Sequence, residues 1–440
     1  MMNDVLSIAE YLTTNKLEYE MTEPDLFGNS GQYTVYPTSE EELSALFAFV
    51  HMHQFTVNIQ GTGSKRGYGG LIDQADLLIS MEKFTGIVEH HSGDMTLTVK
   101  AGTKLEDVQR YLEAFNQKLA LDPFMPYVST IGGVIGSNDS GPKRLNYGSA
   151  RDAVIGLRVV YPDGKVIRTG GKVVKNVAGY DMNKLFISSM GTLGVITEVT
   201  VKLRPLAKST ATCIISFQGE DRNKIYSFTR KLLNNSIEPI SCELLDPVVS
   251  YEISGINKLS LLVSFEDVEK SVDYQIKYIQ SLVEEEMKLT VLRNNEEKQL
   301  WDRLYQLPFD KGPEHDKDEK LFAVAKIGTI NLNVIDILLK VMEIRKKDNI
   351  DIYTHGGVGH GLMQLYIKGK EREMIETLTK IRNITNENGG YCIVKHLPLA
   401  QRLVFDTWGE TKGAQYLLEG IKTKVDPKKI LNRKRYVGGI

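Results

Sequence analysis

The sequence predicts an α+β protein that consists of two domains and a short C-terminal tail. Three observations support this prediction. A chain of 440 residues exceeds the size of one ordinary hydrophobic core. Three glycine-rich loops lie among short strands in the first half, and charged amphipathic helices alternate with strands in the second half. We therefore expect the boundaries to lie at residues 1–206, 207–404 and 405–440.

The overall composition is typical of a soluble globular protein. Hydrophobic residues make up 42% of the chain, charged residues make up 25%, and the formal net charge is −2. A nearly neutral chain gives no electrostatic reason to expect binding to nucleic acid or to an anionic membrane. The three cysteines, Cys213, Cys242 and Cys392, are widely spaced and odd in number, which favours a reducing compartment. We find no secretion signal and no apolar run of the ~20 residues that span a bilayer, so we expect a cytoplasmic protein.

The first domain begins with a strand–helix–strand pattern over residues 33–60. Ser39 and Glu42 have the spacing of a capping box, in which each side chain caps a backbone N–H group of the other residue. Apolar residues then recur at helical spacing over residues 43–50. The following apolar run, residues 55–59, predicts a strand.

A glycine-rich loop, NIQGTGSKRGYGG, occupies residues 58–70. Closely spaced glycines let backbone N–H groups approach a phosphate. A Rossmann dinucleotide site would need this loop to run directly into a helix, whose N-terminus holds the pyrophosphate. Here Gly61, Gly63 and Gly67 give the spacing GxGxxxG, and the loop leads to ADLLISMEKF, which we expect to be a strand. The context disfavours a Rossmann NAD site and leaves two interpretations, a plain turn or a phosphate loop of another fold.

Two further glycine-rich loops complete the first domain. The second lies between Ser129 and Gly148, after a helix that we expect Thr103 to cap. The segment VVYPDGKVIR then predicts a hairpin with a Pro-Asp-Gly turn. The third loop begins SMGTLGVITEV, and the domain ends near Pro205. Three such loops indicate one long ligand that lies across several loops.

The second domain has fewer glycines and more charge. Its predicted strands include STATCIISF and LSLLVSF, and its predicted helices include SVDYQIKYIQSLVEEE and NVIDILLKVMEIRKK. The tail, YLLEGIKTKVDPKKILNRKRYV, predicts one short helix and a loop.

These loops, in this order, resemble the FAD-binding PCMH-type family, which has the vanillyl-alcohol-oxidase fold. Within that family the sequence is most similar to the E-type, FAD-binding subunit of bacterial glycolate oxidase. The resemblance is strong over residues 33–206 and returns at KVDPKKILN, where Arg433 replaces the usual Pro. In the first loop, Gln60 and Thr62 replace the usual Arg and Gly. The segments that carry the resemblance are IQGTGSKRGYG, HSGDMTLTVKAGTKLEDVQ, LALDPF, STIGGVIGSNDSGPKRLNYGSARDAVIGL and, most specifically, GGKVVKNVAGYDMNKLFISSMGTLGVITEVTVKLRP.

The resemblance implies a noncovalently bound FAD in a first domain of two α/β subdomains. Residues 207–404 would form an α+β cap that faces the isoalloxazine, and the tail would return to the FAD domain. Backbone N–H groups can hold a pyrophosphate without buried counter-ions, and no histidine lies in these loops to form a covalent bond to the flavin. Ile196 would lie near the adenine or ribose. The other residues that the resemblance assigns to the cofactor are Gly61, Thr62, Gly63, Ser64, Lys65, Thr130, Gly132, Gly133, Asn138, Ser140 and Gly141.

Relatives of this kind oxidise D-2-hydroxy acids, and their metal-dependent members carry a loop that reads roughly GHxGDGNxH and a later EHG motif. The corresponding loop here, YTHGGVGHGLMQLYI, keeps His355. Val358, His360 and Leu362 replace the Asp, the Asn and the second ligand histidine, and no Glu precedes His396. We therefore expect no metal, although the three histidines leave a metal site open as an alternative. Loss of these ligands resembles the E-type subunit and distinguishes it from its D-type partner.

Two functions from different classes remain. The first is an FAD-dependent 2-hydroxy-acid dehydrogenase or oxidase subunit that oxidises glycolate or D-lactate and passes electrons to a partner or another non-oxygen acceptor. His355, His360 or His396 would be the base, and Arg303 or Lys326 would bind the carboxylate.

The second function is an FAD-holding structural or electron-relay subunit, with catalysis on a partner chain. The three histidines would then be ordinary residues of the cap domain. The chain has no CxxC cluster for an iron–sulfur centre. The resemblance therefore implies partner subunits, a second flavoprotein and an iron–sulfur protein, and contact with the inner face of the membrane would come through them.

Overall fold

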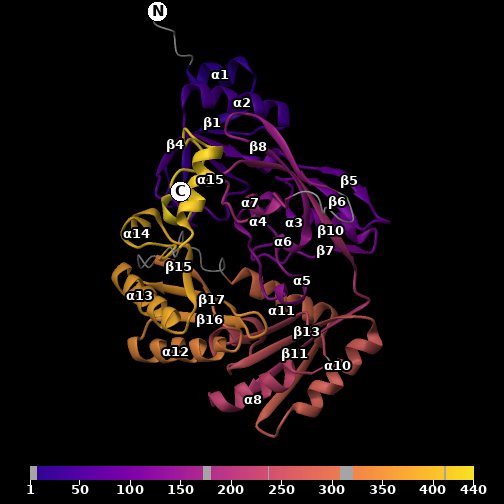
Figure 1. Cartoon of the computed structure of the whole chain (residues 1–440). Helices are drawn as coiled ribbons and strands as arrows, with labels where there is room; N and C mark the ends of the chain where they lie inside the picture. Colours follow the sequence, from indigo (N-terminus) through magenta and orange to yellow (C-terminus); the bar gives the residue numbers. More distant parts are fainter. Residues whose placement is uncertain (1–6, 172–179, 236, 308–320, 411–412) are drawn as a thin grey trace, which may run out of the picture. The chain divides into compact units, whose positions relative to one another are not determined.

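The structure, a computed structural model, describes residues 7–171, 180–235, 237–307, 321–410 and 413–440 (Figure 1). The segment KVVKNVAG, which belongs to the most specific part of the resemblance, lies outside the described residues. The chain forms two compact units. Unit 1 comprises Met1–Ser140, Ser149–Pro205 and Pro398–Ile440, and unit 2 comprises Gly141–Gly148 and Leu206–Leu397.

Unit 1 begins with a four-stranded sheet in the order β1-β2-β4-β3. Strand β1 is antiparallel to β2, whereas β2, β4 and β3 run parallel. Helix α2 connects β2 to β3, and the first glycine-rich loop connects β3 to β4. The capping box of Ser39 and Glu42 is present at the start of α2, which confirms that prediction. The elements are α1 (Ile8–Thr14), β1 (Tyr19–Met21), β2 (Ser30–Val35), α2 (Glu40–His53), β3 (Val57–Gln60), β4 (Gln74–Ser80) and the 3-10 turn η1 (Met81–Lys83).

A second, antiparallel sheet follows in the order β5-β6-β10-β8-β9, and β7 also pairs with β10. Strand β10 alternates buried and partly exposed residues over much of its length, so one face packs on the apolar core. The predicted hairpin is formed by β8 and β9. The elements are β5 (Ile87–His91), β6 (Thr96–Lys100), α3 (Leu105–Glu113), β7 (Gln117–Leu119), α4 (Ile131–Ser137), α6 (Ala150–Ala153), β8 (Val154–Val160), β9 (Val166–Gly170), α7 (Asn183–Phe186) and β10 (Val195–Pro205).

One predicted helix start in this region is wrong. Helix α3 is preceded by Lys104, which makes no side-chain cap. The Thr103 hydroxyl instead accepts a hydrogen bond from the N–H group of Gly86, at 3.0 Å. Thr103 therefore fastens one loop to another and does not cap the helix.

The C-terminal tail packs on unit 1, as the resemblance implies. It contains α14 (Leu399–Val404), α15 (Gln415–Val425) and the 3-10 turn η3 (Val437–Gly439). Leu431 forms a parallel bridge with Val57 at the start of β3. The buried Lys422 ammonium donates hydrogen bonds to the carbonyl oxygens of Thr192 and Leu431 and to the carboxylate of Asp426, all within 2.8 Å. These contacts join the tail to the third glycine-rich loop.

Unit 2 contains an antiparallel sheet of eight strands in the order β14-β11-β13-β12-β16-β17-β15-β18. Helices α13, α12, α8 and α10 form one layer along this sheet (Figure 1). The elements are α5 (Arg144–Tyr147), β11 (Ser209–Phe217), α8 (Arg222–Leu233), β12 (Ser241–Leu245), α9 (Pro247–Ser254), β13 (Ser260–Asp267), α10 (Glu269–Leu282), β14 (Met287–Arg293), α11 (Asn294–Gln306), β15 (Leu321–Gly328), α12 (Asn333–Asp348), β16 (Asp351–Gly357), β17 (Leu362–Gly369), α13 (Glu371–Glu387) and β18 (Tyr391–His396). The two units together confirm the predicted α+β class.

Candidate functional site

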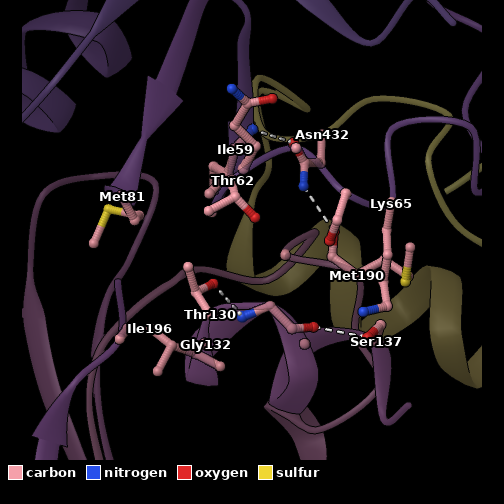
Figure 2. A pocket seen from close by; sticks show the side chains of 18 of the residues that line it. Ile59, Thr62, Lys65, Met81, Thr130, Gly132, Ser137, Met190, Ile196 and Asn432 are labelled. Carbon is pink, nitrogen blue, oxygen red and sulfur yellow. Dashed lines mark hydrogen bonds between the residues drawn. The ribbon is translucent and has the colours of Figure 1, made fainter. Parts of the chain in front are cut away.

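A pocket in unit 1 brings together all three glycine-rich loops (Figure 2). Its walls come from residues 59–66, 129–137 and 190–196, and from Asn432 and Arg435 of the tail. The empty space inside it, including the open mouth, is about 890 Å³.

The first loop offers free backbone donors to this pocket. Among the residues that the structure describes, none accepts a hydrogen bond from the N–H groups of Thr62, Gly63 or Ser64. Such groups are costly to leave unpaired unless water or a ligand satisfies them, and a run of them favours an anion. The loop then leads into β4 and not into a helix. This geometry agrees with the prediction that the loop is not a Rossmann site.

The second loop lines the pocket in a different way. Thr130 caps α4 and accepts a hydrogen bond from the N–H group of Gly133, at 3.2 Å. The N–H group of Gly132 is bound to the carbonyl oxygen of Ala101, so these donors are already used. A Cβ atom at Gly136 would have no heavy atom within 4 Å. The second loop therefore supplies surface and space to the pocket, whereas the first loop supplies donors.

The tail ties the loops together. The Asn432 side chain accepts a hydrogen bond from the N–H group of Ile59 at 2.8 Å and donates one to the carbonyl oxygen of Met190 at 2.7 Å (Figure 2). Arg435 donates to the carbonyl oxygen of Lys65 at 2.9 Å. The sequence prediction missed both tail residues, although the quoted motif KVDPKKILN contains Asn432 and ends three residues before Arg435.

Most of the predicted cofactor residues lie together in this pocket. Asn138 and Ser140, which follow α4, and Gly141, which belongs to unit 2, are not among its lining residues. The Lys65 ammonium lies 3.5 Å from the carboxylate of Asp139, so its charge is compensated within unit 1. The predicted residues that do line the pocket are Gly61, Thr62, Gly63, Ser64, Lys65, Thr130, Gly132, Gly133 and Ile196.

The predicted base His355 lies in the interior of unit 2. It is on β16 and is 0% exposed. Its Nδ1 lies 2.6 Å from a carboxylate oxygen of Glu243, and its Nε2 lies 3.2 Å from the hydroxyl group of Tyr366. Strands β12 and β17 flank β16, which brings Glu243 and Tyr366 to either side of the ring. Both ring nitrogens of His355 are thus occupied within the protein.

His360 is in a different environment, in the turn after β16. Its Nδ1 accepts a hydrogen bond from the N–H group of Leu362 at 3.1 Å. A Cβ atom at Gly357 would lie 2.2 Å from the imidazole, so a glycine is needed beneath the ring. Burial lowers the pKa of His360 below its ordinary value, although the nearby Glu243 carboxylate acts in the opposite direction. The imidazole is therefore neutral near pH 7 and, because its Nδ1 accepts from Leu362, it carries its proton on Nε2.

The positive groups of Lys326 and Arg144 also lower the pKa of His360, so both lie in its electrostatic neighbourhood. Arg144 is on the short helix α5, and Leu145 packs against Gly359 in the same turn as His360. The sequence prediction missed Arg144. It also missed Glu243, although a single carboxylate inside the apolar strand SCELL is a recognisable signal.

The remaining two candidates lie on other elements of unit 2. Arg303 is on α11 and donates a hydrogen bond to the carbonyl oxygen of Ile253 at 3.1 Å. His396 ends β18, and its ring lies 6.1 Å from the ring of Phe322. Within the described ranges, no group of three or more His, Cys, Asp or Glu side chains is arranged to hold a metal ion. In the same ranges, no helix has the length and apolar character that a membrane crossing requires.

Comparisons with known proteins agree with the pocket. Residues 31–170 match the family described as "FAD binding domain". The chain is 33% identical over 230 residues to glycolate oxidase subunit GlcD of Bacillus subtilis, covering 52% of this chain and 48% of that protein. It is 26% identical over 412 residues to the D-lactate dehydrogenase of Archaeoglobus fulgidus, covering 90% and 89%. It is 36% identical over 155 residues to glycolate oxidase subunit GlcE of Escherichia coli, covering 34% and 43%. The match thus spans about half of the length of GlcD and less of GlcE.

Solved structures show the same fold across the chain. The 4-ethylphenol oxidase of Gulosibacter chungangensis superposes with a TM-score of 0.76 and 14% identity, covering 99% of this chain and 98% of that one. The p-cresol methylhydroxylase superposes with a TM-score of 0.72 and 15% identity, covering 98% and 93%. At this identity the likeness establishes the fold alone.

The chain carries an FAD-binding domain of the PCMH type and has the fold of the vanillyl-alcohol-oxidase flavoenzymes. Its relatives include a glycolate oxidase subunit and D-lactate dehydrogenases. The family match over residues 31–170 confirms the predicted FAD-binding domain and FAD as the cofactor. The unpaired N–H groups of Thr62, Gly63 and Ser64 and the open space beside Gly136 fit that cofactor.

Proposed function

We propose that this chain is an FAD-dependent oxidoreductase subunit that oxidises a small 2-hydroxy acid such as glycolate or D-lactate. The pocket in unit 1, with free N–H groups at Thr62, Gly63 and Ser64, is the observation that carries this proposal. The relatives named glycolate oxidase and D-lactate dehydrogenase supply the substrate class. We propose that the first loop holds the pyrophosphate and that Ile196 lies at the adenine or ribose. The absence of a histidine in the predicted loops supports a noncovalent cofactor.

Bound FAD would supply the acceptor for the hydride that leaves the substrate Cα. The protein must then take a proton from the substrate hydroxyl group and pair with its carboxylate. Among the three predicted bases, His360 is the one whose imidazole burial keeps neutral. To take the proton it would have to give up the hydrogen bond that its Nδ1 accepts from the N–H group of Leu362, because the neutral ring then carries its own proton on Nε2. His355 is a weaker candidate, since Glu243 and Tyr366 occupy both of its nitrogens.

The carboxylate of the substrate needs a cationic partner. Lys326, which acts electrostatically on His360, is better placed than Arg303, which is bound to the backbone of α9. Arg144 is a further candidate, and a guanidinium group can bind a carboxylate with two parallel hydrogen bonds. We propose that the electrons leave for a partner subunit or another non-oxygen acceptor. The relatives named as glycolate oxidase subunits support a multi-subunit complex. We propose, from the resemblance alone, that its other members are a second flavoprotein and an iron–sulfur subunit.

A second candidate function is an FAD-holding structural or electron-relay subunit, with catalysis on a partner chain. The buried environment of His355 favours this second function. The position that holds a metal ligand in the metal-dependent relatives is occupied here by a histidine that is hydrogen-bonded to the buried Glu243 and Tyr366. The replacements Val358 and Leu362 in the same loop point in the same direction.

An anaerobic absorption spectrum of the purified chain separates the two functions. We expect flavin bands that bleach when glycolate or D-lactate is added. Bands that stay oxidised with both acids, but that bleach with dithionite, would support the relay function. A His360→Gln variant that bleaches as fast as the wild type would exclude His360 as the base.

A further inference from the structure

Two buried polar atoms of unit 2 are left without a hydrogen-bond partner. They are Oε2 of Glu243, on β12, and Nε2 of His360, in the turn after β16. Glu243 is 2% exposed, and no donor within the described ranges reaches its Oε2. The carbonyl group of Pro142 lies near enough to His360 to favour the protonated ring. Neither that carbonyl group nor another acceptor of the described residues makes a hydrogen bond of ordinary geometry with Nε2.

The register of the sheet places both side chains on the same face. Glu243 is paired with Gly357 of β16, and paired residues of antiparallel strands point to one face, with Cβ positions about 4.5–5.5 Å apart. Gly357 has no side chain, and the imidazole of His360 takes that space, because a Cβ atom at Gly357 would lie 2.2 Å from Nε2. His355, two residues before Gly357, shares this face and binds the other oxygen of Glu243, Oε1. The free oxygen of Glu243 thus lies on the face that His360 covers.

The electrostatic surroundings of His360 agree with this placement. Burial has the largest effect on its pKa, and among the charged groups Glu243 has the largest. The positive groups of Arg144 and Lys326 act on the same ring in the opposite direction. One carboxylate and two cations therefore lie in the neighbourhood of this imidazole.

The existing hydrogen bonds determine which of the two atoms carries a proton. Nδ1 of His360 accepts from the N–H group of Leu362 at 3.1 Å, so the neutral ring carries its proton on Nε2. Oε2 of Glu243 is a carboxylate oxygen and accepts hydrogen bonds. The chain thus presents a donor without an acceptor and, on the same face, an acceptor without a donor.

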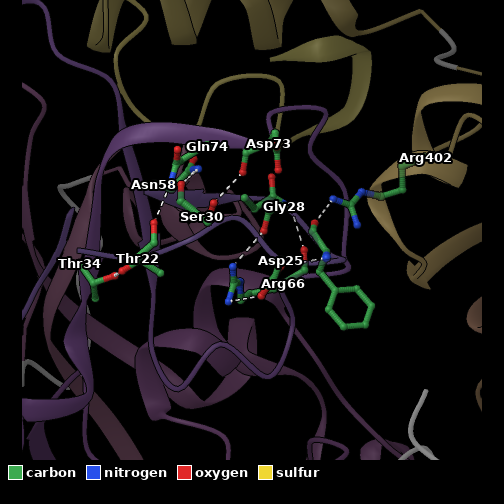
Figure 3. A network of polar contacts seen from close by, with 12 residues as sticks. Thr22, Asp25, Gly28, Ser30, Thr34, Asn58, Arg66, Asp73, Gln74 and Arg402 are labelled. Atoms are coloured by element: carbon green, nitrogen blue, oxygen red, sulfur yellow. Dashed lines mark hydrogen bonds and ion pairs between the residues drawn. The ribbon is translucent and has the colours of Figure 1, made fainter. Parts of the chain in front are cut away.

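Buried polar groups in unit 1 show the usual arrangement, in which each group has a partner. In the network of Figure 3, the hydroxyl group of Ser30 donates to the carbonyl oxygen of Asp73, and the side chain of Asn58 donates to the carbonyl oxygen of Ser30, both at 2.8 Å. A buried polar group without a partner costs free energy, and a charged one costs more. A bound group that pairs with both Glu243 and His360 would relieve this cost.

A hydroxyl group has the chemistry that matches these two atoms. It donates one proton, which suits Oε2, and it accepts through its lone pairs, which suits Nε2–H. A ketone oxygen could only accept from Nε2–H, and an ammonium group could only donate to Oε2. The pair therefore selects an alcohol over the corresponding ketone or amine.

We infer that Glu243 and His360 together hold the hydroxyl group of the 2-hydroxy acid, and that Glu243, not His360, takes its proton. The hydroxyl group donates to Oε2 of Glu243 and accepts from Nε2–H of His360. As the Cα hydrogen leaves as a hydride with two electrons, the hydroxyl proton passes to Oε2 and the C–O bond becomes a carbonyl. The carbonyl oxygen keeps the hydrogen bond from Nε2–H. This inference rests on the proposed function and makes His360 a donor in place of a base.

The first test is the anaerobic rate at which glycolate or D-lactate bleaches the flavin of the FAD-loaded chain. Glu243→Gln removes the proton acceptor and should lower this rate at least ~100-fold, because general-base catalysis contributes about 10²–10⁴. His360→Gln keeps an N–H donor and should lower it less than about tenfold. The matched control is Glu297→Gln, a buried carboxylate of unit 2 whose oxygens accept from the hydroxyl groups of Thr210 and Thr212. It should keep the rate within about twofold of the wild type.

The second test measures binding of the hydroxyl group without turnover. The acid 2-hydroxy-2-methylpropanoate carries the hydroxyl group but has no Cα hydrogen to lose, and 2-methylpropanoate lacks the hydroxyl group. Calorimetric titration of the FAD-loaded chain should show that the hydroxyl group strengthens binding about tenfold. In Glu243→Gln this advantage should fall below about twofold.

Several results would overturn the inference. A Glu243→Gln chain that bleaches as fast as the wild type would assign the two atoms to a buried water. A loss of at least ~100-fold in His360→Gln would make His360 the base. If Glu243→Gln fails to fold, His360→Leu must lose the hydroxyl advantage that His360→Gln keeps, and equal behaviour of these two variants would overturn the inference.

Failure of the proposed function gives a different result. A wild-type chain that bleaches with neither acid, but still prefers the hydroxylated ligand, would contradict the proposed function and support the hydroxyl site. A chain that bleaches with one acid, but shows no effect of Glu243→Gln on rate or binding, would contradict the inference alone.

Discussion

The pocket of unit 1 and the histidine network of unit 2 differ in whether their hydrogen-bonding groups have partners within the protein. In the pocket, the N–H groups of Thr62, Gly63 and Ser64 have no acceptor in the described chain, and open space lies beside them. In unit 2, both ring nitrogens of His355 are satisfied by buried partners. Unsatisfied donors beside open space indicate a binding site, whereas an imidazole whose two nitrogens both have buried partners indicates a structural role. The predictions below test whether this difference is real, from the largest expected effect to the smallest.

Loss of the tail anchor should have the largest effect. Lys422→Met removes an ammonium group that bonds to Thr192, Leu431 and Asp426, and it leaves the fully buried Asp426 carboxylate without its cation. Removal of one partner of a buried ion pair costs about 3–5 kcal/mol. We expect the free energy of unfolding to fall by that amount, measured by urea denaturation. Lys424→Met, at an exposed position on the same helix, should change it by less than about 0.5 kcal/mol. An equal loss of unfolding free energy in the two variants would contradict the role of Lys422 in holding the tail on unit 1.

Filling the pocket should abolish cofactor binding without harming the fold. Gly136→Leu places a side chain into space where a Cβ atom meets nothing within 4 Å. We expect FAD to bind at least ~100-fold more weakly, a loss of about 2.8 kcal/mol. Leu also favours a helix more than Gly does, so the thermal stability of the chain without FAD should not fall.

Gly420→Leu is the matched control for the pocket-filling variant, because Gly420 is also helical, also free of close neighbours and outside the pocket. It should leave the FAD affinity unchanged, as measured by fluorescence titration. Undiminished binding to Gly136→Leu would show that the cofactor lies elsewhere.

Breaking the network of unit 2 should destabilise the chain and spare FAD binding. Glu243→Ala leaves the buried Nδ1 of His355 without its partner, which costs about 1–3 kcal/mol. Every residue that lines the pocket belongs to unit 1, so the FAD affinity should stay within about twofold of the wild-type value. Glu285→Ala, on the surface of unit 2, is the control and should change neither quantity. A large loss of FAD affinity in Glu243→Ala would contradict the claim that FAD binding does not depend on the histidine network of unit 2.

His360 should give a small dependence of stability on pH. Burial lowers its pKa in the folded chain below the ordinary value of 6.5. Between the folded and unfolded pKa values, the unfolded chain binds more protons, so stability rises with pH and is lost as the pH falls below about 6.5. Urea denaturation at pH 5.5 and 7.5 should show a smaller difference for His360→Gln than for the wild type. His51→Gln, in unit 1, should keep the wild-type difference, and an unchanged difference in His360→Gln would contradict the assignment.

Local patterns predicted most of the fold and of the pocket. The capping box at Ser39, the strand after the first glycine loop and the hairpin of β8 and β9 all follow from short segments. The cofactor loops could be predicted because their glycines are close in sequence. Asn432 and Arg435 could not, because their contacts with Ile59 and Lys65 bridge about 370 residues.

The sequence alone could not distinguish between the predicted bases. His355 and His360 lie five residues apart in one segment of the sequence, and the sequence alone makes them equivalent candidates. Glu243 and Tyr366 separate their roles, because the pairing of β12, β16 and β17 decides which imidazole is enclosed. Only the strand order of the sheet carries that information.

The most direct test of this account is a titration of the cofactor-free chain with FAD, followed by gel filtration. We predict saturable binding of one FAD per chain, with the flavin absorption retained in the protein peak and lost in Gly136→Leu. A chain that takes up no FAD, or one that takes it up equally well with Leu at position 136, would contradict the assignment of the unit 1 pocket as the cofactor site.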